Sequence, residues 1–261
     1  MPEKYDEIGT GYNLSRKADP CLTQRLFELL TPIKPGNYLD LGCGTGNYTI
    51  ALNQKGIQMV GIDPSSKMLS EAQYKSSKIK WLEGRAENIP LQDSSIDGAV
   101  CTLTIHHWKD LSQALKELHR ILQKRGKVVI FTSTPEQMHG YWLNHYFPRM
   151  MKDSISQMPP YGVLADALNT NDFKIIRTEK YLIKPGLEDL FLYSGKWNPK
   201  LYLDSQVRQG ISSFSALANK SEVDSGLAQL EYDISTGAMQ EIIDSFENDK
   251  GDYLFVVAEK Q

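Results

Sequence analysis

Short apolar runs alternate with amphipathic segments through the central part of the chain. Over residues 111–122 the apolar positions recur at intervals of three and four, which places them on one face of a helix. This alternation is typical of a mostly parallel sheet covered by helices on both faces, and so of an α/β fold. The runs that predict the first five strands are 38–41, 59–62, 79–82, 98–103 and 128–131.

The regular alternation weakens after Thr134, although two more strands are expected at 173–183 and 251–258. The segments that precede these two strands are too long for plain connections, so we predict that they form helical insertions over a substrate site. The predicted organisation is a single domain over residues 1–261, with an N-terminal helical arm at 1–30 and cap insertions at 136–170 and 185–248.

Aromatic residues gather in the two insertions and allow two interpretations. They line the substrate site, or they form the hydrophobic core of the cap. The residues concerned are Tyr141, Trp142, Tyr146, Phe147, Tyr161, Phe191, Tyr193, Trp197 and Tyr202.

Composition narrows the classes of partner. A formal net charge of −3 provides no basic face for a phosphate backbone, so we expect no nucleic-acid partner. No apolar run is long enough to span a membrane and the N-terminus does not resemble a signal peptide, so we expect a cytoplasmic protein. Cys21, Cys43 and Cys101 lack the spacing of a zinc site or a disulfide framework, which predicts a reducing compartment and no metal. The oligomeric state is left open.

A glycine-rich loop carries the first sign of chemistry. Gly42, Gly44 and Gly46 form a G-x-G-x-G pattern between a strand and a helix, where missing side chains let a ligand approach the backbone and the helix N-terminus. A dinucleotide-binding turn has its third glycine one position later, where this chain has Asn47. The loop alone is also compatible with a tight turn that packs a strand on a helix.

Two acidic residues flank the loop at the ends of predicted strands. Asp63 follows Gly46 by 17 residues (63 − 46), at the position where a carboxylate accepts hydrogen bonds from both hydroxyls of a ribose. Asp40 lies two residues before the first of the glycines and places a second negative charge where it can hold an ammonium group, directly or through water. Each aspartate alone could be a solvated strand end, but the pair at this spacing indicates an adenosine ligand with an amino-acid part.

Two further blocks complete the pattern, residues 83–90 after the third strand and 95–108 around the fourth. In this order the blocks resemble the class I, Rossmann-like S-adenosylmethionine (SAM)-dependent methyltransferases, and in particular the methyltransferase type 11-like group that acts on small molecules. The likeness covers about residues 35–133, and DLGCGTG is its most specific part. Methyltransferases of quinone synthesis and of trans-aconitate methylation are similar as far as the fourth block.

The resemblance implies a three-layer Rossmann-like sandwich whose seven-stranded sheet has an antiparallel last strand, with SAM bound across the carboxyl ends of the strands. It also implies that an N-terminal Tyr and Arg reach the carboxylate end of SAM, although a Tyr-rich arm that simply packs on the surface is nearly as good an interpretation. The residues expected to bind the cofactor are Tyr12, Arg16, Asp40, Gly42, Cys43, Gly44, Gly46, Asp63, Pro64, Met68, Arg85, Ala86, Glu87, Leu103 and Thr104.

His106 and His107 are the candidate catalytic residues. Methyl transfer from a sulfonium depends mainly on alignment and on a dry pocket, and needs a base only when the nucleophile has a proton to lose. Both imidazoles follow the fourth strand on the expected substrate side, where they can accept that proton or simply shape the pocket. Cys43 and Cys101 fall inside core elements, which disfavours a thiolate relay.

The sequence therefore predicts a SAM-dependent methyltransferase that acts on oxygen, nitrogen or carbon of a small molecule. An RNA or protein methyltransferase and a non-catalytic SAM-binding protein are alternatives, since fold and cofactor do not define the acceptor. An NAD-dependent oxidoreductase shares the strand–glycine–helix start, but the missing third glycine argues against it.

Overall fold

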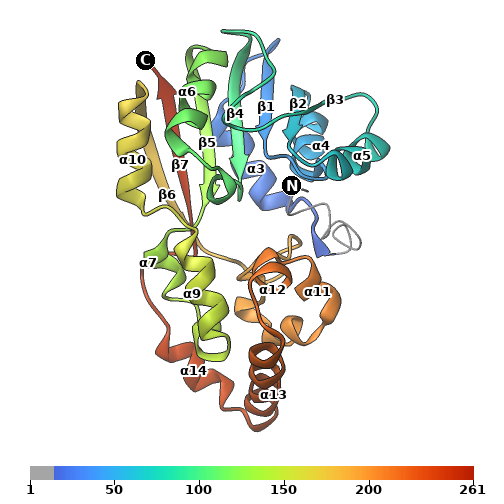
Figure 1. Cartoon of the computed structure of the whole chain (residues 1–261), viewed down its shortest axis with the longest axis vertical. Helices are drawn as coiled ribbons and strands as arrows, with labels where there is room; N and C mark the ends of the chain where they lie inside the picture. The colour runs from blue at the N-terminus through green and yellow to red at the C-terminus, as the bar shows by residue number, and fades with distance from the viewer. Residues whose placement is uncertain (1–14) are drawn as a thin grey trace.

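The computed structural model describes residues 15–261 and has an upper body built on a sheet and a lower body made of helices (Figure 1). Within these residues one seven-stranded sheet has the order β3-β2-β1-β4-β5-β7-β6. Neighbours among β1 to β5 are parallel, whereas β7 is antiparallel to both β5 and β6. The strands are β1 (Asn37–Leu41), β2 (Gln58–Asp63), β3 (Lys80–Glu83), β4 (Ile96–Thr102), β5 (Leu122–Thr132), β6 (Phe173–Tyr181) and β7 (Tyr253–Lys260).

Side chains alternate between the two faces of each strand, and this alternation sets the layers. In β1, Tyr38 packs with helices α3 (Pro20–Leu30) and α4 (Asn47–Gln54), whereas Leu39 and Leu41 pack with α6 (Leu111–Ile121) and α10 (Tyr161–Thr170). Helix α5 (Ser66–Lys75) packs on β2 and β3. The predicted three-layer α/β sandwich with a mostly parallel sheet is thereby confirmed.

The lower body lies beyond the end of the sheet to which β4 and β5 run (Figure 1). Its elements come from two insertions, one after β5 and one after β6, so both leave the sheet on the side where parallel α/β folds bind ligands. The first contains α7 (Pro135–Met138), α8 (Leu143–Tyr146) and α9 (Pro148–Ser156); the second contains η2 (Ser194–Trp197), η3 (Pro199–Leu203), α11 (Ser205–Gln209), α12 (Ser212–Ala216), α13 (Lys220–Thr236) and α14 (Met239–Ser245).

The hydrophobic core continues from the sheet into the lower body. Phe131 at the end of β5 packs on Tyr253, with ring centroids 5.3 Å apart, and Tyr141 stacks on Tyr193 at 3.9 Å. The same cluster of buried residues extends to Trp142, which is fully buried. Most insertion aromatics thus form the core of the cap, and this shared core fixes the cap relative to the sheet.

Two predicted ranges extend too far. The cap range 136–170 includes α10, but Leu164 and Leu168 of that helix pack against α6 and β6, so α10 belongs to a layer of the sandwich. The arm range 1–30 includes α3, which packs on β4 and β5. Both helices bury an apolar stripe against the sheet. The length of the predicted segments did not reveal which surface each helix covers.

Gly46 carries a structural constraint that can be tested by adding a methyl group. Its φ is +76°, and a Cβ there would lie 2.4 Å from Cη2 of Trp81. We expect Gly46→Ala to lower the free energy of unfolding by about 3 kcal/mol, through backbone strain plus overpacking. Gly186→Ala is the matched control, because its φ is +83° with no atom within 4 Å, and about 1 kcal/mol is expected. Equal losses in urea denaturation would contradict the packing role of Gly46.

Candidate active site

Two cavities adjoin at the carboxyl ends of β1, β2 and β4. The larger encloses about 1240 Å³, including open space at its mouth, and the smaller about 760 Å³. Because Gly42, Asp63, Thr104 and His107 line both, the two cavities form one elongated site. Every described residue expected to bind the cofactor lines at least one of them, except Gly46; Tyr12 lies outside the described residues.

The glycine loop is fixed to the end of β2 by backbone hydrogen bonds. The N–H groups of Gly42 and Cys43 both donate to the carbonyl oxygen of Ile62, at 2.8 and 3.0 Å. The Gly44 N–H donates to Oδ2 of Asp63 at 2.8 Å. The loop and Asp63 are therefore held as one unit.

The three glycines of the motif serve different purposes. At Gly42 a Cβ would lie 2.0 Å from Oγ1 of Thr104, so the side chain is excluded by the fold. At Gly46 it would meet Trp81. At Gly44 a Cβ would meet no atom within 4 Å, and this residue lines the larger cavity. Gly44 is thus the glycine whose missing side chain leaves room for a ligand.

Asp63 lies at the junction of the two cavities and is buried. Besides the bond from Gly44, its Oδ1 accepts a hydrogen bond from the Ser65 N–H at 2.9 Å. Two backbone donors from different segments therefore set the orientation of the carboxylate, at the point where a ribose is expected.

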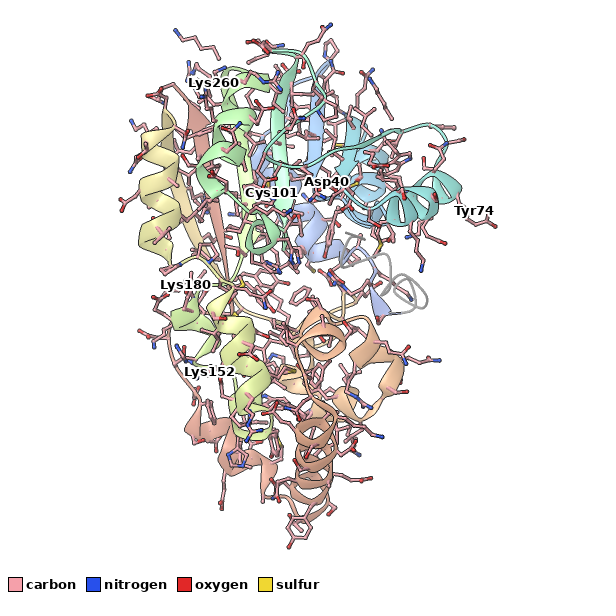
Figure 2. All side chains as sticks on the ribbon, viewed as in Figure 1. Asp40, Tyr74, Cys101, Lys152, Lys180 and Lys260 are labelled. Carbon is pink, nitrogen blue, oxygen red and sulfur yellow. The ribbon has the colours of Figure 1, made fainter. Side chains whose placement is uncertain are left out.

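Asp40 is more deeply buried, with 2% of its surface exposed, and it lines the larger cavity. Figure 2 shows it inside the upper body, toward the lower body. Burial raises the pKa of Asp40, a 2.6 Å hydrogen bond from Thr49 Oγ1 lowers it, and the nearby negative charge of Asp63 raises it; together these effects bring the pKa to about 7. An ammonium group beside Asp40 would stabilise its charged form.

The smaller cavity contains the block that follows β3. Pro64, Arg85, Ala86 and Glu87 all line it. The Glu87 carboxylate accepts a hydrogen bond of 2.6 Å from the Lys109 N–H, which fixes this block to the segment before α6. Ala86 lies in this lining, where the adenine ring is expected.

Arg16 reaches the larger cavity, but its guanidinium is paired with a residue of the cap. Its Nε lies 2.5 Å from Oδ1 of Asp189, which is only 1% exposed. The Tyr48 hydroxyl donates to Oδ2 of Asp189 at 3.0 Å. The expectation that Arg16 lies at the cofactor site stands as a prediction, and the structure adds a buried anionic partner.

The two candidate catalytic histidines lie in η1 (Ile105–His107), directly after β4, with ring centroids 3.9 Å apart. His106 lines the larger cavity and His107 lines both. Leu103, just before them, has a φ of +52°, which is strained for a residue with a side chain.

Burial raises the pKa of the Cys43 thiol well above its ordinary value, so this cysteine stays protonated.

Sequence reasoning missed the part of the larger cavity that the cap supplies. No short motif marks these residues, because they come from segments that only the tertiary fold brings together. They are Met138, Ser154, Gln157, Met158, Asp189, Leu192, Ile211, Ser212, Ser213 and Leu217, while Phe191 belonged to the aromatic set in which either role was open.

Comparison with known proteins identifies the family. A family model described as a methyltransferase domain matches residues 39–130. The demethylmenaquinone methyltransferase of Thermotoga maritima is 32% identical over 157 residues, which are 57% of this chain and 68% of that protein. The chain belongs to the SAM-dependent methyltransferases.

Two further proteins show how far this likeness extends. The crystal structure of a proposed methyltransferase from an antibiotic biosynthesis pathway of Anabaena variabilis has a TM-score of 0.84 and 31% identity, and covers 95% of this chain and 99% of that one. A malonyl-[acyl-carrier protein] O-methyltransferase of Pectobacterium atrosepticum is 34% identical over 109 residues, 42% of this chain and 43% of that protein. The structural likeness to the Anabaena variabilis protein thus includes the cap. The sequence likeness to the Pectobacterium atrosepticum enzyme covers less than half of either chain.

The residues of the site fit SAM. Gly44 leaves open space in the wall of the larger cavity, Asp63 stands at the junction, and Ala86 lines the adjoining smaller cavity. In the predicted assignment the methionine part lies at Gly44, the ribose at Asp63 and the adenine at Ala86, and Asp40 would provide the anion for the ammonium group. These residues would hold SAM along one continuous surface.

The raised pKa of Asp40 predicts a pH-dependent affinity for S-adenosylhomocysteine. The ligand's ammonium group favours ionised Asp40, so affinity should fall as pH decreases through about 7, by up to about tenfold per pH unit. Calorimetric titration between pH 8 and 5.5 measures the effect, and Asp40→Asn should flatten the profile. A wild-type profile that matches Asp40→Asn would refute this role.

Gly44→Ala tests the fit of the cofactor against the loop. The added methyl group points into the cavity, so we expect affinity for S-adenosylhomocysteine to fall at least about 100-fold. Unfolding free energy should fall by only about 1 kcal/mol, since the strain of the left-handed backbone is the sole cost. Calorimetry and urea denaturation separate the two effects; unchanged affinity would show that the ligand does not approach Gly44.

Proposed function

We propose that this methyltransferase transfers the methyl group to an oxygen, nitrogen or carbon atom of a small molecule bound in the larger cavity. The observation that supports the proposal is the extent of that cavity, which continues from the glycine loop to residues of both cap insertions, such as Ser154 and Ser213. A site enclosed by a cap on a shared core suits a small acceptor better than a polymer.

In this proposal the residues of the chain mainly align and enclose the reactants. SAM, when bound, supplies a methyl group that is already activated as a sulfonium. Thr104 and Leu103 lie at the end of β4 beside the glycine loop, and the cap would limit the access of water to the reacting atoms once both reactants are bound. His106 accepts a proton from the acceptor when the nucleophile has one to lose.

The alternatives are a methyltransferase that acts on RNA or protein and a SAM-binding protein without transfer. The net charge of −3 disfavours RNA, because enzymes that act on RNA need a basic face.

We also propose a cytoplasmic location, supported by the three free cysteines Cys21, Cys43 and Cys101. Among residues 15–261 no helix has both the length and the apolarity to cross a membrane.

The proposal is tested by the release of S-adenosylhomocysteine from SAM in the presence of cell extract divided by size. Release with the low-molecular-mass fraction supports a small acceptor. Release only with the RNA or protein fraction would establish one of the polymer alternatives. No release with any fraction would leave the non-catalytic interpretation and overturn the proposal.

His106→Gln tests the role of a base. If the acceptor loses a proton to His106, kcat should fall about 100-fold while the affinity for S-adenosylhomocysteine stays the same. His139→Gln is the control, because His139 is exposed and does not line the cavity. A rate for His106→Gln within about threefold of the His139→Gln rate would remove His106 from catalysis.

A further inference from the structure

We infer that the acceptor of this methyltransferase is uncharged and largely apolar, and that it accepts or donates a hydrogen bond at the hydroxyl of Ser154. The inference rests on the proposed function, since it specifies the molecule that the cap side of the larger cavity receives. It follows from three properties of the described residues of that wall: six apolar side chains, a carboxylate that is paired, and a buried hydroxyl.

Six of the eleven cap residues that line the larger cavity are apolar. Their side chains are thioethers, aliphatic groups and an aromatic ring, which favour a ligand that buries carbon atoms. The residues are Met138, Met158, Phe191, Leu192, Ile211 and Leu217.

Among the described residues that line the larger cavity, charged side chains either form an ion pair or lie away from the cap side. Asp189 is the one carboxylate that the cap contributes, and it is held by Arg16 and Tyr48. Asp40 and Asp63 belong to the cofactor end, and Lys17 is exposed to solvent. An ionised acceptor would therefore lose its hydration without gaining a counter-ion on the cap side.

Uncharged side chains at the C-terminal end of α9 line the cavity. Ser154 lies in the last turn of the helix, Gln157 is its C-cap residue, and Met158 follows directly; all three line the cavity. The charged residues of α9 are Arg149, Lys152 and Asp153; all three are exposed and none of them lines the cavity. Lys152 is labelled in Figure 2. The same element thus separates charge from the cavity and places hydrogen-bonding groups in it.

Ser154 combines a place in the lining of the cavity with a hydroxyl that has no partner among the described atoms. The residue is 6% exposed, and its Oγ is buried without a hydrogen-bond partner among the described atoms. A buried hydroxyl without a partner is unfavourable, and proteins rarely keep one unless a ligand or water completes it. Ser212 and Ser213 of α12, which packs on α9, also line the cavity and add further neutral polar groups.

Three probes with the same ring system test the inference: neutral 1-naphthol, anionic 1-hydroxy-2-naphthoate and cationic 1-naphthylmethylammonium. Calorimetry on the protein saturated with S-adenosylhomocysteine should show binding of 1-naphthol, with both charged probes at least about tenfold weaker. Ser154→Ala should weaken 1-naphthol about fivefold, the effect of one neutral hydrogen bond. Ser156→Ala is the control, because Ser156 is exposed on the same helix.

The inference is overturned if a charged probe binds as tightly as 1-naphthol, if 1-naphthol does not bind, or if Ser154→Ala and Ser156→Ala have equal affinity for it. Unchanged binding of S-adenosylhomocysteine by Ser154→Ala shows that the variant is folded. Failure of the proposed function has a different signature, because it is the lack of S-adenosylhomocysteine release with every low-molecular-mass fraction. A charged acceptor identified in such a fraction would overturn the inference and leave the proposed function intact.

Discussion

The hydrogen bond from the Gly44 N–H to the Asp63 carboxylate connects the two segments from which the cofactor site is built. It joins the loop after β1 to the end of β2, and the two bonds to the Ile62 carbonyl oxygen reinforce it. Because the same carboxylate is also held by Ser65, its position is set before any ligand arrives. Such preorganisation lowers the entropic cost of binding and places the junction of the two cavities at a fixed point.

The cap depends on a different constraint, the core that it shares with the sheet. Phe131, Tyr253 and Trp142 belong to one continuous cluster, so the lower body has a fixed position over the strand ends. Backbone contacts add to this: the Leu190 N–H donates to the Ser15 carbonyl oxygen at 3.0 Å, beside the Arg16–Asp189 ion pair. The walls of the larger cavity thus come from the sheet, the N-terminal segment and the cap, held together by packing and by ion pairs that include Arg16–Asp189 and Lys196–Asp252.

The cofactor half of the site was predictable because its signals are local. Gly42, Gly44 and Asp63 occur at fixed distances after strands whose apolar runs are easy to recognise, and parallel strands bring their carboxyl ends together. The pattern did not separate the glycines by role, since the packing of Gly46 against Trp81 depends on a residue 35 positions away (81 − 46).

The cap half was not predictable, and the reason is physical. Ser154, Phe191 and Ser213 meet only in the folded chain, and each residue type is ordinary in its own segment. Hydrophobic periodicity identified helices but not the surface each one covers, which is why α10 was assigned to the cap although it packs on β6. Long-range packing determines both the acceptor wall and the layer to which a helix belongs.

A crystal structure with S-adenosylhomocysteine tests the central claim, that one cofactor extends across both cavities with its ribose at Asp63. The account predicts the adenine beside Ala86, both ribose hydroxyls on the Asp63 carboxylate and the amino-acid part against Gly44, with the space under Ser154 left for the acceptor. Adenine in the larger cavity beneath the cap, or a ribose with no contact to Asp63, would contradict it.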